Sequence, residues 1–411
     1  MCIAQSHIVR RPRRSLRCLF MRLAASLLPV LSVLTFSCLA NTSEAELSPF
    51  QAIADLPSRN SLTQGDTRYQ PPQDLSTLPF ISGAVALDNF GGDDDKGRLA
   101  GAINLHGVVA QNDLLSLRSM GTAEAGHYHW GAYQLDVGPW SSRLGVMLSD
   151  LSYELGDELE ILAAKGKTRT ASAFVIQPLL QDNAFRLTAR VQYDDKHLQD
   201  EIGLLGIDSD KRSRVLRYGL SATAQDPLLS GATSGLELSW SEGSLNIDGS
   251  PYSLLGKADE VRFRVLRAEL TRLQQLGGRF ALYLNAQGQW SDDNLDDSEK
   301  LYIGGVFGVR SAEQAAAYGD RGWLASAELR YALTDRWQLM TFADHGEARL
   351  NTPGLATDTA PRRLSAAGVG AGWSAHGWNI STLAAWKVGD HPAQRDTDNR
   401  PRIWAQLAYS F

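Results

Sequence analysis

The residues of this sequence that could do chemistry are charged side chains set among apolar and glycine residues. Arg310 ends the run LYIGGVFGVR at residues 301–310, which contains Gly304, Gly305 and Val309. A run so rich in glycine and apolar side chains suits solvent poorly, so we expect it to fold inward and to carry Arg310 with it. An arginine in such a place is suited to charge-assisted hydrogen bonds.

A second charged residue, Asp344, lies in a segment of alternating character. Phe342 and Asp344 share one face of this segment, and Gly346 follows two residues later. The other face carries Trp337, Leu339, Thr341 and Ala343. If that apolar face meets lipid, Asp344 points to the opposite, interior side.

Other candidate sites carry weaker signals. His127 and His129 could share a strand face, but no carboxylate or cysteine accompanies them at ligand spacing, so we expect a loop or aromatic-girdle role and no metal. The acidic run at residues 93–95 suits a solvated loop better than a cation site. We find no nucleophile elbow and no phosphate-binding loop. The sequence therefore predicts no catalytic residues, no enzyme and no cofactor.

Composition narrows the classes of function. Lys and Arg number 40 against 46 Asp and Glu, and this net charge of -6 argues against nucleic-acid binding. The mean hydropathy of -0.22 excludes a helical membrane protein, but it suits a barrel whose polar lumen residues alternate with lipid-facing ones. The three cysteines all fall in the first 40 residues, so the rest of the chain offers no disulfide and no thiolate.

The first 77 residues differ from the rest in composition and in their pattern of apolar residues. Arg10, Arg11, Arg13, Arg14 and Arg17 precede an apolar stretch at residues 23–36, which predicts a signal peptide over residues 1–40, with Met21 as a possible true start. A transmembrane anchor and a lipoprotein are the alternatives. Residues 41–77 are rich in Ser, Gln, Asp and Pro, which predicts a periplasmic linker or a short plug helix.

From residue 78 to residue 411 the pattern is uniform. About sixteen segments of 9–13 residues alternate with period two between turn-rich breaks. This predicts an all-β protein, an antiparallel transmembrane β-barrel in the bacterial outer membrane, surrounded by lipid. A soluble β-sandwich or β-helix is the alternative.

Alternation also assigns faces. In residues 323–331 the apolar side chains oppose Ser326, Glu328 and Arg330, and an arginine on the lipid side would cost roughly 2–4 kcal/mol. We therefore expect Glu328 and Arg330 to face the lumen. The final stripe ends at Tyr409 and Phe411, like the terminal tag that the barrel-assembly machinery reads.

The connections alternate in length. Short links at residues 332–336 and 374–377 contrast with long ones at residues 196–211, 243–260, 291–320, 351–361 and 387–400. Short periplasmic turns and long extracellular loops give this alternation, so the amino terminus should lie in the periplasm, and residues 291–320 should form the sixth long loop. Tryptophans near strand ends predict interfacial anchors, among them Trp130, Trp140, Trp337, Trp373 and Trp386.

Together these segments resemble the outer-membrane transporters of two-partner secretion, the haemolysin secretion/activation (ShlB/FhaC/HecB) proteins of the BamA-like superfamily. The resemblance covers residues 78–411. Its most specific pieces are the Gly-Gly-x-x-x-Val-Arg loop ending at Arg310, the stretch from Gly319-Asp320 to Glu328-Leu329-Arg330, and Phe342-x-Asp344-x-Gly346. Asp88-Asn89-Phe90-Gly91 and Gly368-Val369-Gly370 are weaker pieces.

The resemblance implies that an unfolded secreted exoprotein passes through the lumen and folds outside without ATP. It also implies that the arginine of the inward sixth loop, Arg310, contacts Asp344, and we expect this pair to lock the loop. The pair could instead stabilise the barrel without gating transport.

Two features depart from the family pattern. Ser311 and Ala312 follow Arg310 where the family has glycine and an aromatic residue. Residues 41–77 are too few for the periplasmic POTRA domains of the family, so we expect none in this chain. A passive channel or structural barrel, a remnant without export activity, is therefore the alternative function.

Overall fold

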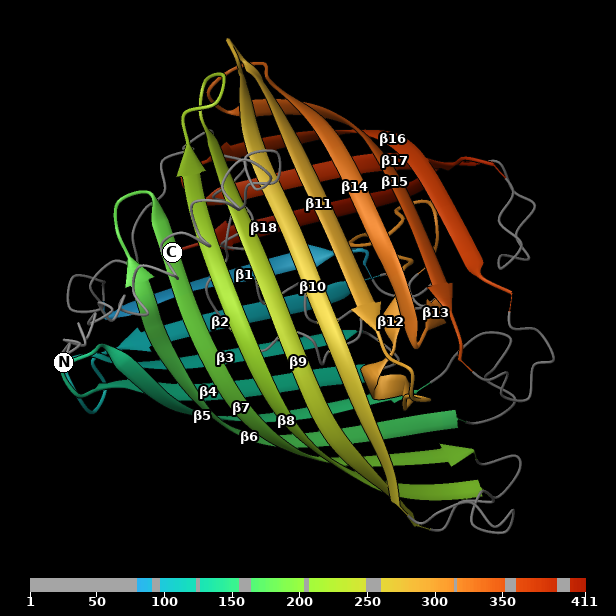
Figure 1. Ribbon diagram of the computed structural model, residues 1–411. Helices are drawn as coiled ribbons and strands as arrows, with labels where there is room; N and C mark the ends of the chain where they lie inside the picture. The colour runs from blue at the N-terminus through green and yellow to red at the C-terminus, as the bar shows by residue number, and fades with distance from the viewer. Residues whose placement is uncertain are drawn as a thin grey trace, which may run out of the picture.

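The structure, a computed structural model, describes residues 80–90, 97–122, 126–154, 164–202, 207–248, 260–313, 316–351, 360–389 and 400–411. Within these ranges sixteen antiparallel strands close into a barrel (Figure 1). The first eleven are β1 (Ile81–Asp88), β2 (Arg98–His106), β3 (Asp113–Thr122), β4 (Gly126–Val137), β5 (Ser142–Glu154), β6 (Ala164–Gln181), β7 (Phe185–Ile202), β8 (Ile207–Asp226), β9 (Ala232–Asp248), β10 (Glu260–Gly277) and β11 (Phe280–Trp290). The last five are β14 (Arg321–Ala332), β15 (Trp337–Arg349), β16 (Arg362–Ala375), β17 (Trp378–Lys387) and β18 (Arg402–Ser410).

Residues 291–320 join β11 to β14 and carry their own short elements. These are the 3-10 helix η6 (Asp297–Glu299) and the paired strands β12 (Leu301–Tyr302) and β13 (Tyr318–Gly319). This connection is the sixth on its side of the barrel, as expected. Among the described residues, no helix has the length and apolar character needed to cross a membrane.

Neighbouring strands pair in sequence order, and the barrel closes where β1 meets β18, from Ala84 beside Ser410 to Asp88 beside Gln406. The short links are tight turns. Between β16 and β17, His376 and Gly377 both have positive φ, 50° and 81°, as a type I′ turn requires to match the twist of a hairpin. The prediction of an antiparallel barrel of about sixteen strands is confirmed.

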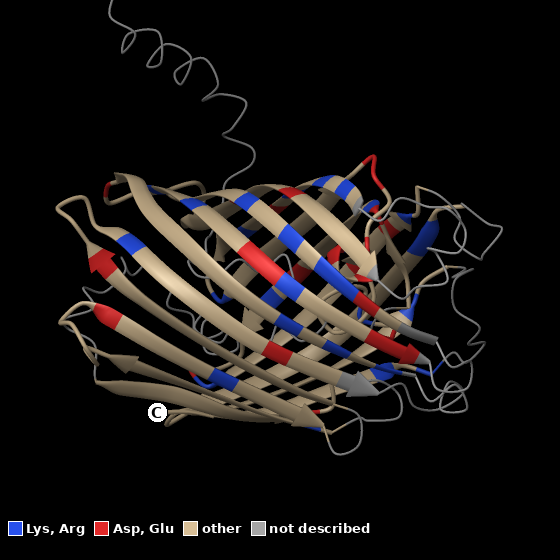
Figure 2. Cartoon of the chain, turned by 90° about the horizontal axis from the view of Figure 1, so that it is seen from below, with Lys and Arg blue, Asp and Glu red and all other residues tan. Residues whose placement is uncertain are grey.

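Each strand has an outer face with exposed apolar side chains and an inner face with buried, often polar, ones. On β18 the outer face carries Ile403, Leu407 and Tyr409, whereas Gln406 is buried on the inner face. On β14 Glu328 is buried, and Arg330, on the same face, donates to it at 2.9 Å. On these strands, alternation in the sequence therefore corresponds to one exposed and one buried face. Figure 2 shows basic and acidic residues close together along the long strands.

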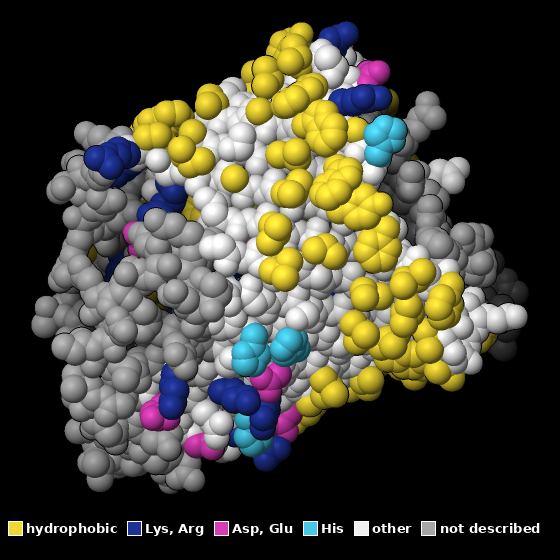
Figure 3. Space-filling model, turned by 180° about the vertical axis from the view of Figure 1, so that it is seen from behind, with side chains coloured by type: hydrophobic (Ala, Val, Ile, Leu, Met, Phe, Trp, Pro, Cys, Tyr) yellow, Lys and Arg dark blue, Asp and Glu magenta, His cyan; other side chains and the backbone are white. Residues whose placement is uncertain are grey.

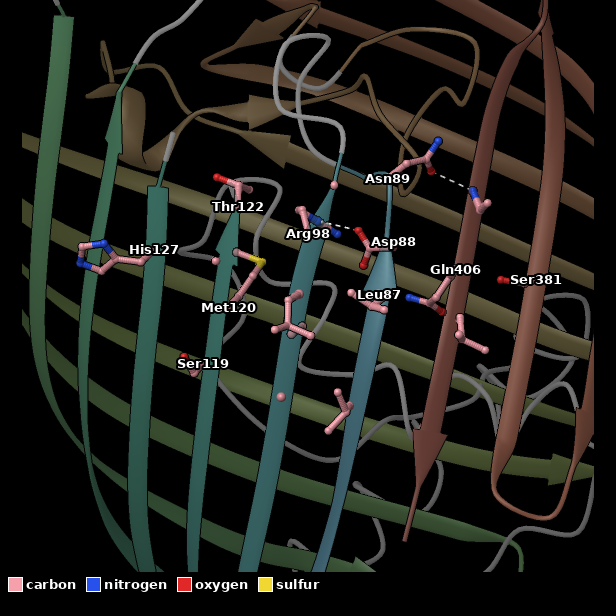
Figure 4. Close-up of a pocket in the computed structure, with 18 of the residues that line it drawn as sticks. Leu87, Asp88, Asn89, Arg98, Ser119, Met120, Thr122, His127, Ser381 and Gln406 are labelled. Carbon is pink, nitrogen blue, oxygen red and sulfur yellow. Dashed lines mark hydrogen bonds and ion pairs between the residues drawn. The ribbon is translucent and has the colours of Figure 1, made fainter. Parts of the chain in front are cut away.

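Polar contacts and the carboxyl terminus hold β1 to its two neighbours, β2 and β18. Arg98 of β2 donates to Asp88 of β1 at 2.7 Å, and both side chains are fully buried (Figure 4). Asn89 accepts from the backbone N–H of Ala405 in the next strand at 2.8 Å (Figure 4). Phe411 exchanges backbone hydrogen bonds with Gly83, at 2.9 and 3.0 Å.

Gly83 has a steric reason to be glycine, because a Cβ there would come within 2.6 Å of the Phe411 ring. Phe411 and Tyr409 stack on the outer face with ring centroids 6.4 Å apart. Their recognition by the assembly machinery stays a prediction.

Two expectations are wrong in detail. Most of residues 196–211 and part of residues 243–260 are strand and not loop, since β7 extends to Ile202, β8 starts at Ile207 and β9 reaches Asp248. Polar side chains on both faces of these strand ends resemble a loop in sequence. Trp130 is no interfacial anchor, because it is buried on the inner face under the guanidinium of Arg118, 4.8 Å from the ring centroid.

Three further expectations fall outside the described residues. They are the signal peptide at residues 1–40, the linker or plug helix at residues 41–77 and the acidic run at residues 93–95. They stay predictions.

Candidate functional site

The glycine-rich run of the sixth connection folds into a compact turn that presents Arg310. Val309 donates its backbone N–H to Ile303 O at 2.8 Å, and Gly308 donates to Gly305 O at 3.0 Å. Gly305 has φ +97°, and a Cβ on Gly304 would come within 2.1 Å of the backbone oxygen of Glu313. Both positions therefore need glycine, one for its conformation and one for close packing.

The Arg310 side chain, 6% exposed, binds carboxylates on two neighbouring strands. Nε and Nη2 donate to Asp344 of β15 at 2.9 and 2.6 Å, and Nη1 donates to Glu328 of β14 at 2.6 Å. Ser326 accepts a further bond from Nη2 at 2.9 Å and itself donates to Asp344 at 2.8 Å. Burial lowers the pKa of Arg310, but the Asp344 hydrogen bonds and the Glu328 charge raise it above its ordinary value. The guanidinium therefore stays charged.

The other two residues of the Phe-x-Asp-x-Gly pattern shape the same contact. The Arg310 guanidinium lies 3.5 Å from the ring centroid of Phe342, within the range of a cation–π interaction. A Cβ on Gly346 would lie 3.3 Å from the Cβ of Ile303, which is fully buried. Phe342 thus stacks on the arginine, Asp344 pairs with it, and Gly346 leaves room for the loop.

A second charged contact holds the other end of the connection, and sequence reasoning missed it. Glu299 of η6 is 1% exposed. It accepts from Lys196 of β7 at 2.8 Å and from Arg267 of β10 at 2.8 Å. Burial would raise the pKa of Glu299, but the charges of Lys196 and Arg267 outweigh it and hold the pKa at about 2. Lys196 is 103 residues away in sequence, so no local pattern indicates the pair.

The connection also contacts the seam between β1 and β18. Trp404 of β18 donates its indole N–H to the backbone oxygen of Arg310 at 2.8 Å. The Phe307 ring meets Phe90, just after β1, edge-on at 5.8 Å, and Phe90 meets Trp404 at 5.9 Å. Arg310 and Phe307 therefore join the sixth connection to β18 and to the residue Phe90 just after β1.

The sequence matches one known protein family over most of its length. Residues 76–375 match the family described as haemolysin secretion/activation protein ShlB/FhaC/HecB, and this match covers well over half of the chain. The chain belongs to this family. It is therefore placed in the outer membrane of Gram-negative bacteria, where barrels of this type reside.

The relatives are longer than this chain. The chain is 25% identical over 343 residues to the heme/hemopexin transporter protein HuxB of Haemophilus influenzae strain 86-028NP, covering 80% of this chain and 60% of HuxB. With HuxB of strain KW20 it is 27% identical over 258 residues, covering 62% of this chain and 45% of that protein. The chain thus spans about half to three fifths of these relatives.

Solved structures agree on the fold. CdiB from Escherichia coli aligns with a TM-score of 0.66 and 17% identity, covering 82% of this chain and 64% of CdiB. BamA from Haemophilus ducreyi, lacking POTRA domains 1-3, aligns with a TM-score of 0.58 and 12% identity, covering 81% and 71%. The chain therefore shares the fold of these two barrels.

The departure from the family pattern after Arg310 is accommodated. Ala312 is fully buried and donates its backbone N–H to Val309 O at 3.0 Å. Ser311 donates its hydroxyl to the backbone oxygen of Ser365 in β16 at 3.3 Å. The turn therefore packs closely without the glycine and aromatic residue that the family pattern has at these positions.

The two histidines that the sequence places on one strand face lie beside a single carboxylate. His127 and His129 lie on the outer face of β4 with ring centroids 5.2 Å apart. His127 Nε2 is 3.9 Å from Asp150, a carboxylate that also pairs with Arg169 at 2.8 Å. No group of three or more His, Cys, Asp or Glu placed to hold a metal is found in the described part of the chain.

Proposed function

We propose that this chain is the barrel of a two-partner-secretion translocator, which passes an unfolded exoprotein through its lumen across the outer membrane without ATP. Family membership supports this function more than it supports a passive channel or structural barrel. The proposed partners are the exoprotein, the barrel-assembly machinery during biogenesis and outer-membrane lipid. Because the curated relatives are named heme/hemopexin transporters, an exoprotein that captures one of these ligands is the first to test.

The observation that carries the proposal is the environment of Arg310. Its guanidinium binds Asp344, Glu328 and Ser326 and stacks on Phe342, all from β14 and β15. Such a contact fixes one conformation of residues 291–320 against the wall. We propose that these residues fold into the lumen, that they obstruct it in the resting state, and that the Arg310 contact is the lock.

The second contact makes the lock two-sided. Glu299 binds strands β7 and β10, whereas Arg310 binds strands β14 and β15. Both contacts consist of ion pairs and hydrogen bonds, which can dissociate and re-form without covalent change. We propose that the exoprotein displaces these contacts as it enters.

Secretion in a Gram-negative host tests the proposal. The chain is produced together with an epitope-tagged exoprotein encoded beside its gene, and the tag is measured in the medium and in the periplasm. We expect tag in the medium only when the chain is present. Tag that stays in the periplasm, although the barrel is assembled, would favour the passive channel.

A further inference from the structure

A groove lies on the outer face of the barrel beside the seam between β1 and β18. Its volume is about 1160 Å³, and residues of β1 to β4, β17 and β18 line it (Figure 4). Its floor on β3 has small residues, Ser119 and Gly121. Among the described residues, a Cβ on Gly121 would meet only the backbone oxygen of Gly126 within 4 Å, at 3.9 Å. The groove is therefore open because the floor lacks large side chains.

The two sides of the groove differ in chemical character. On β1 and β2 its side chains are Val85, Leu87 and Leu99, all exposed on the outer face. On β4 they are His127 and His129, also exposed, with ring centroids 5.2 Å apart. One side is thus apolar and the other polar, which suits an amphiphilic molecule.

The polar side continues from β4 onto β5 and β6. Strand pairing gives two rows, which are His127, Ser152 and Lys167, and His129, Asp150 and Arg169. We call these six residues the polar array. Figure 3 shows the side of the barrel that lies behind in Figure 1, with histidine, acidic and basic side chains gathered beside the apolar ones. Neighbouring strands lie about 4.8 Å apart, so the two cations have their Cα atoms about 10 Å from those of the histidines.

The polar array has more positive than negative charge. Asp150, its one carboxylate, accepts from Arg169 at 2.8 Å and lies 3.9 Å from Lys167. The Arg169 side chain is 65% exposed and that of Lys167 39%. Two cations therefore share one carboxylate and keep donors that face outward. Ammonium and guanidinium groups of this kind bind phosphate through charge-assisted hydrogen bonds.

The polar array begins where the apolar zone of the outer face ends. On β5 the exposed Leu144, Val146 and Leu148 are followed on the same face by Asp150 and Ser152. This end of β5 is the end of the barrel at which the sixth connection lies, and the loop lengths predict that it is extracellular. Because barrel strands tilt by about 35–45°, the apolar β1 end of a row and its charged β6 end lie at different depths. The array thus fits the headgroups of the outer leaflet, and the apolar side of the groove fits the hydrocarbon.

We propose that the groove and the polar array bind one molecule of lipid A, the phosphorylated glycolipid of the outer leaflet. One acyl chain lies in the groove against Leu87 and Leu99, and one phosphate lies between Lys167 and Arg169. Because Leu407 of β18 and Ile380 of β17 also line the groove, the bound lipid covers the outer side of the seam. The site depends on location in the outer membrane and not on the proposed secretion function.

Lipid binding to the purified full chain tests the site, with one variant for each half. Native mass spectrometry follows lipid A with both phosphates, the same lipid after removal of its phosphates, and phosphatidylglycerol. The double variant Lys167→Gln/Arg169→Gln removes the cations of the array. Its control, Arg212→Gln/Arg214→Gln, removes two cations from the outer face of β8, where they lie near Asp195.

A second variant fills the groove. Gly121→Leu places an apolar side chain on the floor, where a Cβ has room. Its control, Ala173→Leu, adds a leucine on the outer face of β6, outside the groove. The two variants are independent, so failure of one to assemble leaves the other as the test.

We expect Lys167→Gln/Arg169→Gln to bind phosphorylated lipid A about tenfold more weakly than the wild type, and its control to change by less than about twofold. Removal of the phosphates should weaken binding to the wild type, as should added salt. Gly121→Leu should weaken the binding of both forms of lipid A, and Ala173→Leu should not.

Three results would overturn the proposal. Equal binding of both forms of lipid A to the wild type would remove the phosphate contact. Wild-type affinity of the Gly121→Leu barrel would remove the groove. Phosphatidylglycerol that binds as tightly as lipid A would overturn the choice of lipid.

Discussion

At the scale of single residues, the sixth connection is held by buried charges from opposite ends. Arg310 offers its guanidinium to Asp344 and Glu328, and Glu299 receives Lys196 and Arg267. Removing one member of a buried ion pair leaves the other charge without compensation. The resulting loss of folding free energy is larger than the net stabilisation that the intact pair provides. Each contact should therefore respond sharply to a single substitution.

Arg310→Ala should destabilise the barrel by about 3–5 kcal/mol, because Asp344 and Glu328 then repel each other without a cation between them. Arg310→Ala/Asp344→Ala should cost less than the sum of the two single changes. Thermal or denaturant unfolding of the reconstituted barrel measures both effects. Additive losses would mean that the two residues do not act as a pair.

Glu299 gives the connection a dependence on pH. Because its folded pKa lies at about 2, below the ordinary value of 4.5, its stabilisation is complete above pH 4.5 and disappears as the pH falls through about 2. The stabilisation from the lowered pKa amounts to about 3 kcal/mol of unfolding free energy. The variant Glu299→Gln should lose this stabilisation. Unfolding midpoints of the wild type and Glu299→Gln should converge over that range. Midpoints that differ by the same amount at every pH would contradict the lowered pKa of Glu299.

Part of the residue-scale site was predictable and part was not. The apolar glycine run and the Phe-x-Asp-x-Gly pattern together led to Arg310 and Asp344, and the structure brings these two residues into contact. Glu299 lies in an acidic stretch that is typical of an exposed loop. Its contact in the folded barrel is with Lys196, which is 103 positions away in the sequence. Periodicity reports which face a residue takes, but it does not report which distant residue lies opposite.

At the scale of elements, glycines decide how closely the sixth connection can pack. Gly304 meets the backbone of Glu313, and Gly346 meets Ile303. A Cβ on Gly304 would meet backbone that cannot shift easily, whereas a Cβ on Gly346 would lie 3.2 Å from the backbone oxygen of Trp323 and 3.3 Å from the Cβ of Ile303, which requires a shift of only a few tenths of an ångström. The connection should therefore undock when a single methyl group is added at residue 304.

Gly304→Ala should release the connection, because its Cβ would lie 2.1 Å from the backbone oxygen of Glu313. We expect the conductance of the refolded barrel in planar bilayers to rise and to fluctuate more. Gly101→Ala on β2 is the control, since nothing lies within 4 Å of a Cβ there. Unchanged conductance of the Gly304→Ala barrel would show that the turn does not restrict the pore.

The ends of the strands show where alternation of apolar and polar residues stops predicting a strand. Within the bilayer, lipid on one side forces strict alternation, and strands such as β14 and β18 were recognisable. Beyond the bilayer, water also contacts the outer face, so the ends of β7, β8 and β9 carry polar side chains on both faces. In the sequence these ends resemble loops.

At the scale of the whole molecule, the barrel combines a closed wall with ion pairs and hydrogen bonds that join this wall to the sixth connection. The connection before β14 touches β7, β10, β14, β15 and β18 through charged or aromatic side chains. In the proposed function, passage of a polypeptide through the lumen requires these contacts to open. A wall that stays closed while the connection moves is the central feature of the proposed mechanism.

A disulfide that fixes the connection to the wall tests this feature most directly. The double variant Ile303→Cys/Gly346→Cys is suited to it, because a Cβ at residue 346 lies 3.3 Å from that of Ile303, close to the roughly 3.5–4.5 Å of a disulfide. All native cysteines fall in the first 40 residues, and each single variant serves as a control.

Secretion of the tagged exoprotein is then measured with the disulfide formed and after reduction. We predict that the oxidised double variant blocks secretion, that reduction restores it, and that the single variants secrete under both conditions. Secretion by the fully oxidised barrel at the level of the reduced one would contradict the account, since the exoprotein would then cross without moving the connection.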